Sequence, residues 1–344
     1  MQRDPLVLTR RNERPDISDF ECPVSAYGEA LGSSPGVRSA LQEALQTYRA
    51  RSQPRRGGGA PAAAPCVQLF FVHVPKCGGK SVETWLDERF GVNAHAGNNQ
   101  SFVQRVADAL RAIERGETLP TSAYTLHTYV ERQGEKVLDQ FPQLLERLLD
   151  ARARTQLLRE RGQPTCQVRL ATVLRNPPEQ MRSAFFFDRG KRLGKWYKSF
   201  PEYLSAASRC GDIDMQLSFL LGRWEEAKTC RRVLRTTKAP PALSLPWMLQ
   251  LLGRFDHVGT MERLDQTLNW MAEALHVAHP ADVGAAVNVG RYNRTAAALE
   301  FRATSTGQLA CEKAEHDAFL FRFAQEAARV GDVRKKRTQT LEQG

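Results

Sequence analysis

One segment restricts the fold of this chain more than any other. At residues 70–85, with the sequence FFVHVPKCGGKSVETW, an apolar run leads through a glycine turn into an amphipathic helical pattern. A strand that turns directly into a helix is typical of a strand-helix-strand unit, in which the next strand lies parallel to the first. Short apolar runs keep alternating with longer amphipathic stretches after residue 66. We therefore predict an α/β fold with a central parallel sheet flanked by helices.

The same periodicities give the expected elements. Four strands are predicted, at residues 67–74, 123–127, 168–174 and 257–260. Apolar residues three or four apart predict helices at residues 35–48, 79–90, 102–115, 178–188, 212–221, 243–252, 264–276 and 311–330. Residues 51–65, RSQPRRGGGAPAAAP, lack periodicity and predict a flexible linker. We expect an N-terminal extension at residues 1–50, this linker, one domain over residues 66–330 and a basic tail at residues 331–344.

Charge and cysteine content narrow the classes of function. The 344 residues include 49 Lys and Arg against 38 Asp and Glu, a net charge of +11 that favours anionic ligands such as nucleotides, acidic glycans or nucleic acid. No apolar stretch approaches the roughly 18 residues of a membrane-spanning helix. Because the seven cysteines form no CxxC pair, we expect reduced, mostly buried thiols and no zinc ribbon.

The loop at residues 75–81 contains the residue types that bind a phosphate or sulfate group. Gly78 and Gly79 allow backbone N–H groups to approach an anion, and the dipole of the following helix favours negative charge there. Lys76 and Lys80 add positive charge. This segment therefore predicts an anion site at the start of a helix.

Two known loops compare with this run. Its end, Gly79-Lys80-Ser81, matches the end of a Walker A loop, but Val74 stands where the first glycine of that motif belongs. The whole run resembles, at all but two positions, the P-K-T-G-G-T-S loop of the PAPS-dependent carbohydrate sulfotransferases. In that family the loop binds the 5′-phosphosulfate of PAPS (3′-phosphoadenosine 5′-phosphosulfate). The resemblance implies a P-loop-like sulfotransferase fold and PAPS contacts from Pro75, Lys76, Cys77, Gly78, Gly79, Lys80 and Ser81.

A second motif follows the third predicted strand. Residues 174–185, LRNPPEQMRSAF, resemble the family's R-[DN]-P-x-x-R-x-x-S-x-[YF] site for the 3′-phosphate, with Gln180 in place of the inner arginine. Arg175, at a strand end, can bind a phosphate through two N–H groups, and Ser183 can add a hydroxyl donor. We predict both as ligands of the 3′-phosphate.

Three further segments are similar to the same family. Residues 255–264, FDHVGTMERL, resemble its F-D-x-V-G-x-T-E-R-F segment, and residues 214–220, DMQLSFL, resemble its N-x-Q-x-R-x-L helix with Ser218 in place of the arginine. Asn293-Arg294-Thr295 resembles its N-[KR]-[ST] loop near the nucleotide. The resemblance thus implies that Asn293 and Arg294 contact PAPS.

The chemistry would need a base and positive charge. Sulfuryl transfer requires removal of the acceptor proton and stabilisation of charge that grows on the leaving group, and no metal ion is required. The resemblance assigns charge stabilisation to Lys76, while Lys80 replaces a family threonine. His127 ends the second predicted strand, where heparan and galactose sulfotransferases carry a histidine, so we predict it as the base. Glu83 and Asp87, one turn apart on the next helix, are the alternative bases.

The acceptor is indicated by one basic segment. Residues 189–198, RGKRLGKWYK, hold five cations and two aromatic residues, which fits either an anionic glycan or a basic lid over PAPS. We predict sulfuryl transfer from PAPS to a hydroxyl of a carbohydrate, either a glycan or a glycolipid, with no nucleic-acid partner. The alternatives are a nucleotide kinase or NTPase with a degenerate Walker A loop and a noncatalytic protein that binds nucleic acid or glycans. Golgi members of the family commonly carry a membrane anchor, and without one here we expect a soluble cytoplasmic enzyme, with the Golgi lumen as the alternative.

Overall fold

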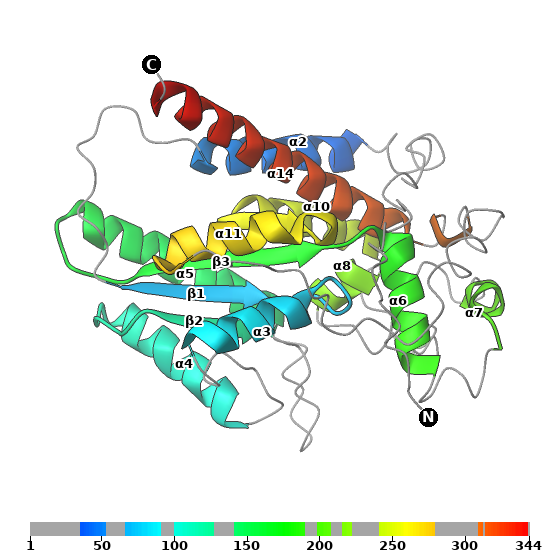
Figure 1. Cartoon of the computed structure of the whole chain (residues 1–344), viewed down its shortest axis with the longest axis horizontal. Coiled ribbons are helices and arrows are strands. Elements are labelled where there is room, and N and C mark those ends of the chain that lie inside the picture. The colour runs from blue at the N-terminus through cyan, green and yellow to red at the C-terminus, as the bar shows by residue number, and fades with distance from the viewer. Residues whose placement is uncertain are drawn as a thin grey trace, which may run out of the picture.

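A four-stranded parallel sheet forms the centre of the molecule (Figure 1). The computed structural model describes residues 35–52, 66–90, 100–126, 141–189, 198–207, 215–221, 241–278, 309–311 and 314–342. The strand order is β2-β1-β3-β4, with the bounds β1 (Val67–Val72), β2 (Ser122–Leu126), β3 (Gln167–Leu174) and β4 (His257–Thr260). The predicted α/β class with a central parallel sheet is confirmed.

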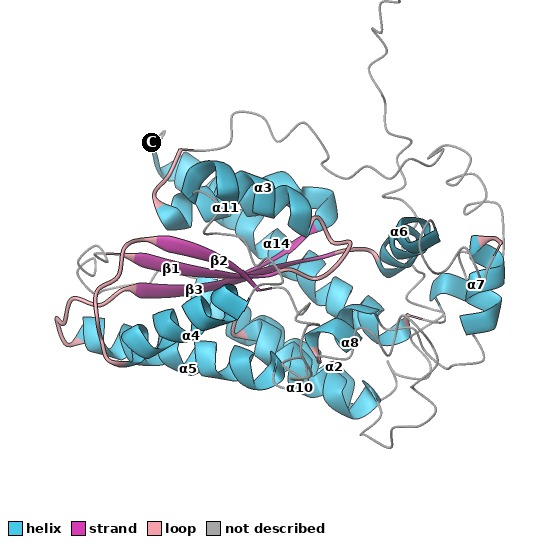
Figure 2. Ribbon diagram, turned by 90° about the horizontal axis from the view of Figure 1, so that it is seen from below, coloured by secondary structure: helices cyan, strands magenta, loops and turns pink. Residues whose placement is uncertain are grey.

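Helices cover both faces of this sheet (Figure 2). Leu69 and Phe71 of β1 pack against α3 (Gly79–Phe90) and α11 (Leu264–Leu275) on one face. Phe70 and Val72, which alternate with them, point to the other face and to α4 (Gln100–Glu114) and α5 (Phe141–Glu160). Because both faces are covered, all six residues of β1 are buried, as is usual for a parallel sheet.

The helix nearest the N-terminus joins the same core. Helix α2 (Pro35–Ser52) buries Val37, Ala44 and Tyr48 in the apolar cluster that also contains α10 (Pro241–Gly253) and α14 (Glu315–Glu342). A Cβ on Gly253 would lie 2.7 Å from the carbonyl oxygen of Ala44, so α2 and α10 approach each other at backbone distance. The part of the expected extension that lies in α2 therefore packs on the body of the molecule.

Several helices differ from the expected pattern. Helices α5 and α7 (Phe200–Ala207) were not predicted, and α14 continues to Glu342, beyond the expected end at residue 330. Helix α8 is shorter than predicted, at Met215–Leu220, while α6 (Pro177–Arg189) and the 3-10 helix η5 (Met261–Arg263) follow β3 and β4 directly. None of the described helices is long and apolar enough to cross a bilayer.

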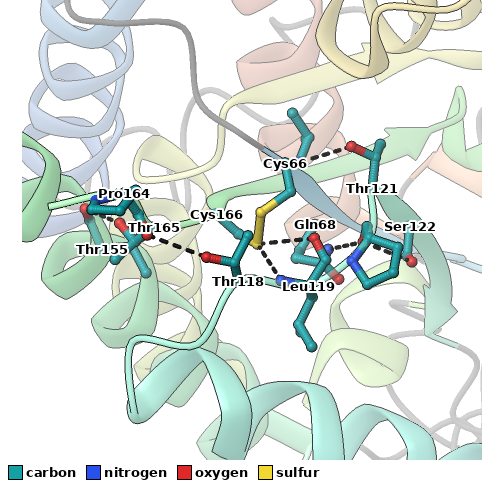
Figure 3. The surroundings of a disulfide bond; sticks show 12 residues. Cys66, Gln68, Thr118, Leu119, Thr121, Ser122, Thr155, Pro164, Thr165 and Cys166 are labelled. Carbon is teal, nitrogen blue, oxygen red and sulfur yellow. Dashed lines mark hydrogen bonds between the residues drawn. A yellow bond between two sulfur atoms is a disulfide. The ribbon is translucent and has the colours of Figure 1, made fainter.

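The prediction of reduced cysteines is wrong for three of the four cysteines that the structure describes. Cys66 and Cys166 form a disulfide (Figure 3), and Cys311 is also disulfide-bonded, which leaves Cys77 as the free cysteine among the described residues. Val67 and Gln167 are register partners on β1 and β3, so the residues just before them lie side by side, with their Cα atoms 4.6 Å apart. The two cysteines are 100 residues apart in sequence and are brought together only by the strand order.

Candidate functional site

The strand order fixes where a ligand can bind. In the strand order, β2 is the neighbour of β1 on one side, and β3 is its neighbour on the other side. The chain therefore reverses its direction of progress across the sheet after β2. In open α/β sheets, ligands bind at such a switch point, beyond the carboxyl ends of the strands. The loop at residues 75–81 follows β1, and Arg175 follows β3, so both predicted motifs lie at this edge (Figure 1).

The loop is tightly packed against its neighbours. Gly78 has a φ of 82°, and a Cβ there would lie 2.3 Å from the Met261 sulfur. A Cβ on Gly79 would lie 1.8 Å from the His73 ring. Both positions therefore require glycine. Helix α3 begins at Gly79, so the positive end of its dipole faces the loop.

Lys76 is held by two contacts to other elements. It has a φ of 66°, which is rare for a residue with a side chain, and its carbonyl oxygen accepts a hydrogen bond from Arg175 Nη1 at 3.1 Å. Its ammonium group lies 2.9 Å from the centre of the Phe187 ring on α6, in a cation–π contact. The two predicted motifs thus meet at Lys76.

A cluster of charged groups on α6 surrounds Arg175. The Glu179 Oε2 atom accepts hydrogen bonds from Arg182 Nη2 at 2.7 Å and from Arg175 Nη2 at 3.4 Å. Two guanidinium groups therefore share one carboxylate beside the loop. Ser183 is half-buried on the same helix, one turn after Glu179. Sequence reasoning missed Glu179 and Arg182, although their spacing of three residues on a helix was a usable signal.

Gln180 ties this helix to the loop. Its side chain has no exposed surface, and its Nε2 atom donates to the Pro75 carbonyl oxygen at 2.8 Å. Gln180 thus fixes the first residue of the loop at residues 75–81.

Helix α3 holds a second group of charges. The Glu83 carboxylate lies 2.6 Å from His73 Nδ1 and 3.4 Å from the ammonium of Lys80. His73 and Glu83 are both buried. The Glu83 carboxylate, one of the alternative bases, is therefore engaged by two neighbours.

Two groups at this edge have raised pKa values. Burial raises the pKa of the Cys77 thiol well above its usual value. Glu262 follows β4, and its Oε1 atom accepts the N–H of Asn176 at 3.3 Å. Withdrawal of the Glu262 carboxyl group from water raises its pKa, and the positive charge of nearby Arg175 opposes this shift. Part of the Glu262 residue is nevertheless exposed. Glu262 joins the site through its contact with the residue after Arg175.

The remaining predicted site residues, His127, Asn293 and Arg294, lie outside the described residues, as do residues 190–197 of the basic segment. Within the described ranges, no group of three or more His, Cys, Asp or Glu side chains could hold a metal ion. Comparisons with protein-family models, curated proteins and solved structures find no match for the chain.

Proposed function

We propose that this protein is a PAPS-dependent sulfotransferase that transfers the sulfuryl group to a hydroxyl of a carbohydrate, either a glycan or a glycolipid. One observation carries the proposal. Arg175 contacts Lys76 across 99 residues of sequence, at the switch point of the sheet. PAPS carries anionic groups on both its 5′ and 3′ positions, and these two residues belong to the two motifs that the resemblance assigns to those groups.

Each residue then has a defined task. The backbone N–H groups at the start of α3 bind the 5′-phosphosulfate, with Lys80 nearby, while Arg175 and Ser183 bind the 3′-phosphate. The acceptor oxygen attacks sulfur, and the bond from sulfur to the bridging oxygen of the 5′-phosphate breaks. Lys76 leaves the ring of Phe187 and stabilises the charge that grows on that oxygen.

The acceptor side of the reaction is proposed from the sequence. His127 follows β2 directly and would take the acceptor proton, while Asn293 and Arg294 would add contacts to PAPS. The net charge of +11 and the basic segment at residues 189–198 favour an anionic carbohydrate.

The disulfides bear on the compartment. Disulfide bonds persist in oxidising compartments and are rare in the cytosol. Because Cys66, Cys166 and Cys311 are all disulfide-bonded, we favour an oxidising lumen such as that of the Golgi over the cytoplasm.

The deciding experiment compares nucleotides by calorimetry. Adenosine 3′,5′-bisphosphate should bind at least about tenfold more tightly than AMP, because each charge-assisted hydrogen bond to the 3′-phosphate contributes about 1.5–3 kcal/mol. Arg175→Ala should abolish this preference. Arg169→Ala is the matched control, because Arg169 also lies in the β3 segment but pairs with Asp256 at 3.1 Å, away from the loop.

Other outcomes point elsewhere. Equal affinity for AMP and the bisphosphate would refute the sulfotransferase proposal. Tight Mg²⁺-dependent binding of ATP would favour the kinase alternative, and binding of nucleic acid that weakens steeply with salt would favour the noncatalytic alternative. With the nucleotide preference established, labelled PAPS and a panel of sulfated, carboxylated and neutral glycans would identify the acceptor class.

A further inference from the structure

A buried amide on α8 contacts the main chain of Arg175. Gln216 has no exposed surface; its Oε1 atom accepts the Arg175 N–H at 3.0 Å, and its Nε2 atom donates to the Arg175 carbonyl oxygen at 2.8 Å. Strand β3 ends at Leu174, one residue earlier. The Gln216 side chain therefore bonds the N–H and the carbonyl group of Arg175 as a neighbouring strand would. It does so one residue beyond the end of β3, where the described strands supply no such partner.

The same amide also contacts the anion loop. The Cys77 sulfur lies 3.7 Å from Gln216 Oε1 and 3.6 Å from the Pro75 carbonyl oxygen, and its one S–H can donate to either acceptor. Burial keeps this thiol protonated by raising its pKa, so it remains a donor at neutral pH. One side chain thus touches the two chain segments that the proposed function assigns to opposite ends of PAPS.

Helix α14 fixes the backbone from which Gln216 extends. The fully buried Asp317 accepts the N–H groups of Gln216 at 2.8 Å and of Leu217 at 2.7 Å. These N–H groups belong to the first turn of α8, where a helix offers them no internal partner. Asp317 therefore supplies a cap from another element and restrains the start of α8.

We propose that Gln216, held by Asp317, is a positioning residue that sets the backbone of Arg175 and thereby the selectivity for a 3′-phosphate. This inference rests on the proposed function. Bidentate recognition by a guanidinium group tolerates little displacement, and a ligand residue at the frayed end of a strand needs a second element to fix it. Gln216 provides that restraint without itself touching the nucleotide.

The test compares Gln216→Leu with Gln68→Leu. Gln68 is equally buried, but it bonds the Pro120 carbonyl oxygen at 2.5 Å near the amino end of the sheet. Gln216→Leu removes the hydrogen bonds to the Arg175 backbone, and Gln68→Leu removes those to the Pro120 carbonyl and from the Tyr124 hydroxyl, so either substitution should lower the melting temperature. Only Gln216→Leu should reduce the ratio of the Kd for AMP to the Kd for adenosine 3′,5′-bisphosphate, by about tenfold or more.

A second variant, Gln216→Glu, provides the test if Gln216→Leu does not fold. Gln216→Glu keeps an acceptor for Arg175 and Cys77 but places a carboxylate oxygen against the Arg175 carbonyl, so the ratio should fall here too. A ratio equal to that of the unmodified protein in the folded Gln216 variants would overturn the inference while leaving the proposed function intact. A ratio near one in the unmodified protein would instead overturn both.

Discussion

Lys76 combines an unfavourable backbone conformation with the charge stabilisation that we propose for it. A residue with a side chain at a φ of 66° costs about 1–2 kcal/mol relative to a right-handed conformation. Its carbonyl contact with Arg175 and its ammonium contact with Phe187 hold it there. Glycine would fit the backbone better, so the backbone conformation does not by itself favour a lysine at this position.

Two substitutions at this position should separate stability from activity. Lys76→Gly should be more stable than Lys76→Ala by about 1 kcal/mol, because glycine adopts a positive φ without strain. Both should lower sulfuryl transfer by about 10²-fold or more, because both remove the ammonium group. Denaturant unfolding and turnover with labelled PAPS would measure the two effects. An alanine variant as stable as the glycine variant would contradict the conformational argument.

Cys77 should be chemically silent in the folded protein. Burial raises its pKa, so the fold favours the protonated thiol. This contribution to stability is present below the pKa that the Cys77 thiol has in the unfolded chain. It is lost as the pH rises toward the pKa that the thiol has in the folded protein. Iodoacetamide at pH 8 should leave Cys77 unmodified in the native protein and modify it after unfolding in urea, as read by mass spectrometry. Rapid labelling of the native protein would show that the thiol is accessible.

Sequence patterns predicted where the glycine loop and Arg175 lie in the fold, but not which residues contact them. The glycine loop and Arg175 each follow an apolar strand, so local pattern located them. Gln216 bonds Arg175 across 41 residues, and Asp317 bonds Gln216 across 101. Contacts at such separations depend on how α8 and α14 pack, which periodicity within one element does not specify.

At the scale of elements, the junction of β1 and α3 is closely restricted by packing. The ring of His73 is held by Glu83 at 2.6 Å and occupies the space that a side chain on Gly79 would need. Helix α3 can therefore begin next to β1 only because position 79 lacks a Cβ. The glycine that sequence analysis assigned to anion binding also has this packing role.

Gly79→Ala should destabilise the protein by about 1–3 kcal/mol, the usual cost of overpacking. Gly36→Ala is the control, because a Cβ on Gly36 of α2 meets no described atom within 4 Å. That control should stabilise the protein by about 0.4–1 kcal/mol. Urea unfolding of both variants would provide the comparison, and two equal shifts would argue against the clash with His73.

Strands and helices were predicted correctly where their apolar residues are buried on one face or on all sides. The four strands were predicted within two residues of their observed ends because their apolar runs are buried. Helix α5 was missed; in it Arg152 is buried and Leu157 is 47% exposed, which blurs the apolar stripe. Helix α14 continues past residue 330 through a largely polar sequence, so hydrophobic periodicity could not predict its end.

For the whole molecule, the disulfide and the candidate site lie at opposite ends of the same two strands. Cys66 and Cys166 precede β1 and β3, whereas the anion loop and Arg175 follow them. A crosslink that spans 100 residues restricts the unfolded chain strongly. The bond should therefore affect stability and not nucleotide recognition.

The double variant Cys66→Ala, Cys166→Ala should lower the free energy of unfolding by about 2–5 kcal/mol. Its preference for adenosine 3′,5′-bisphosphate over AMP should equal that of the unmodified protein, measured at a temperature where both are folded. A folded double variant that loses the preference would show that the crosslink shapes the site.

The spacing between β1 and β3 is fixed at both of their ends. A covalent bond joins them before their first residues, six register pairs join them along their length, and Arg175 bonds Lys76 just beyond their last residues. We therefore expect β1 and β3 to keep their register and their separation, without sliding along each other or moving apart. If the proposed nucleotide binds at this edge, we expect it to enter and leave without separation of the two strands.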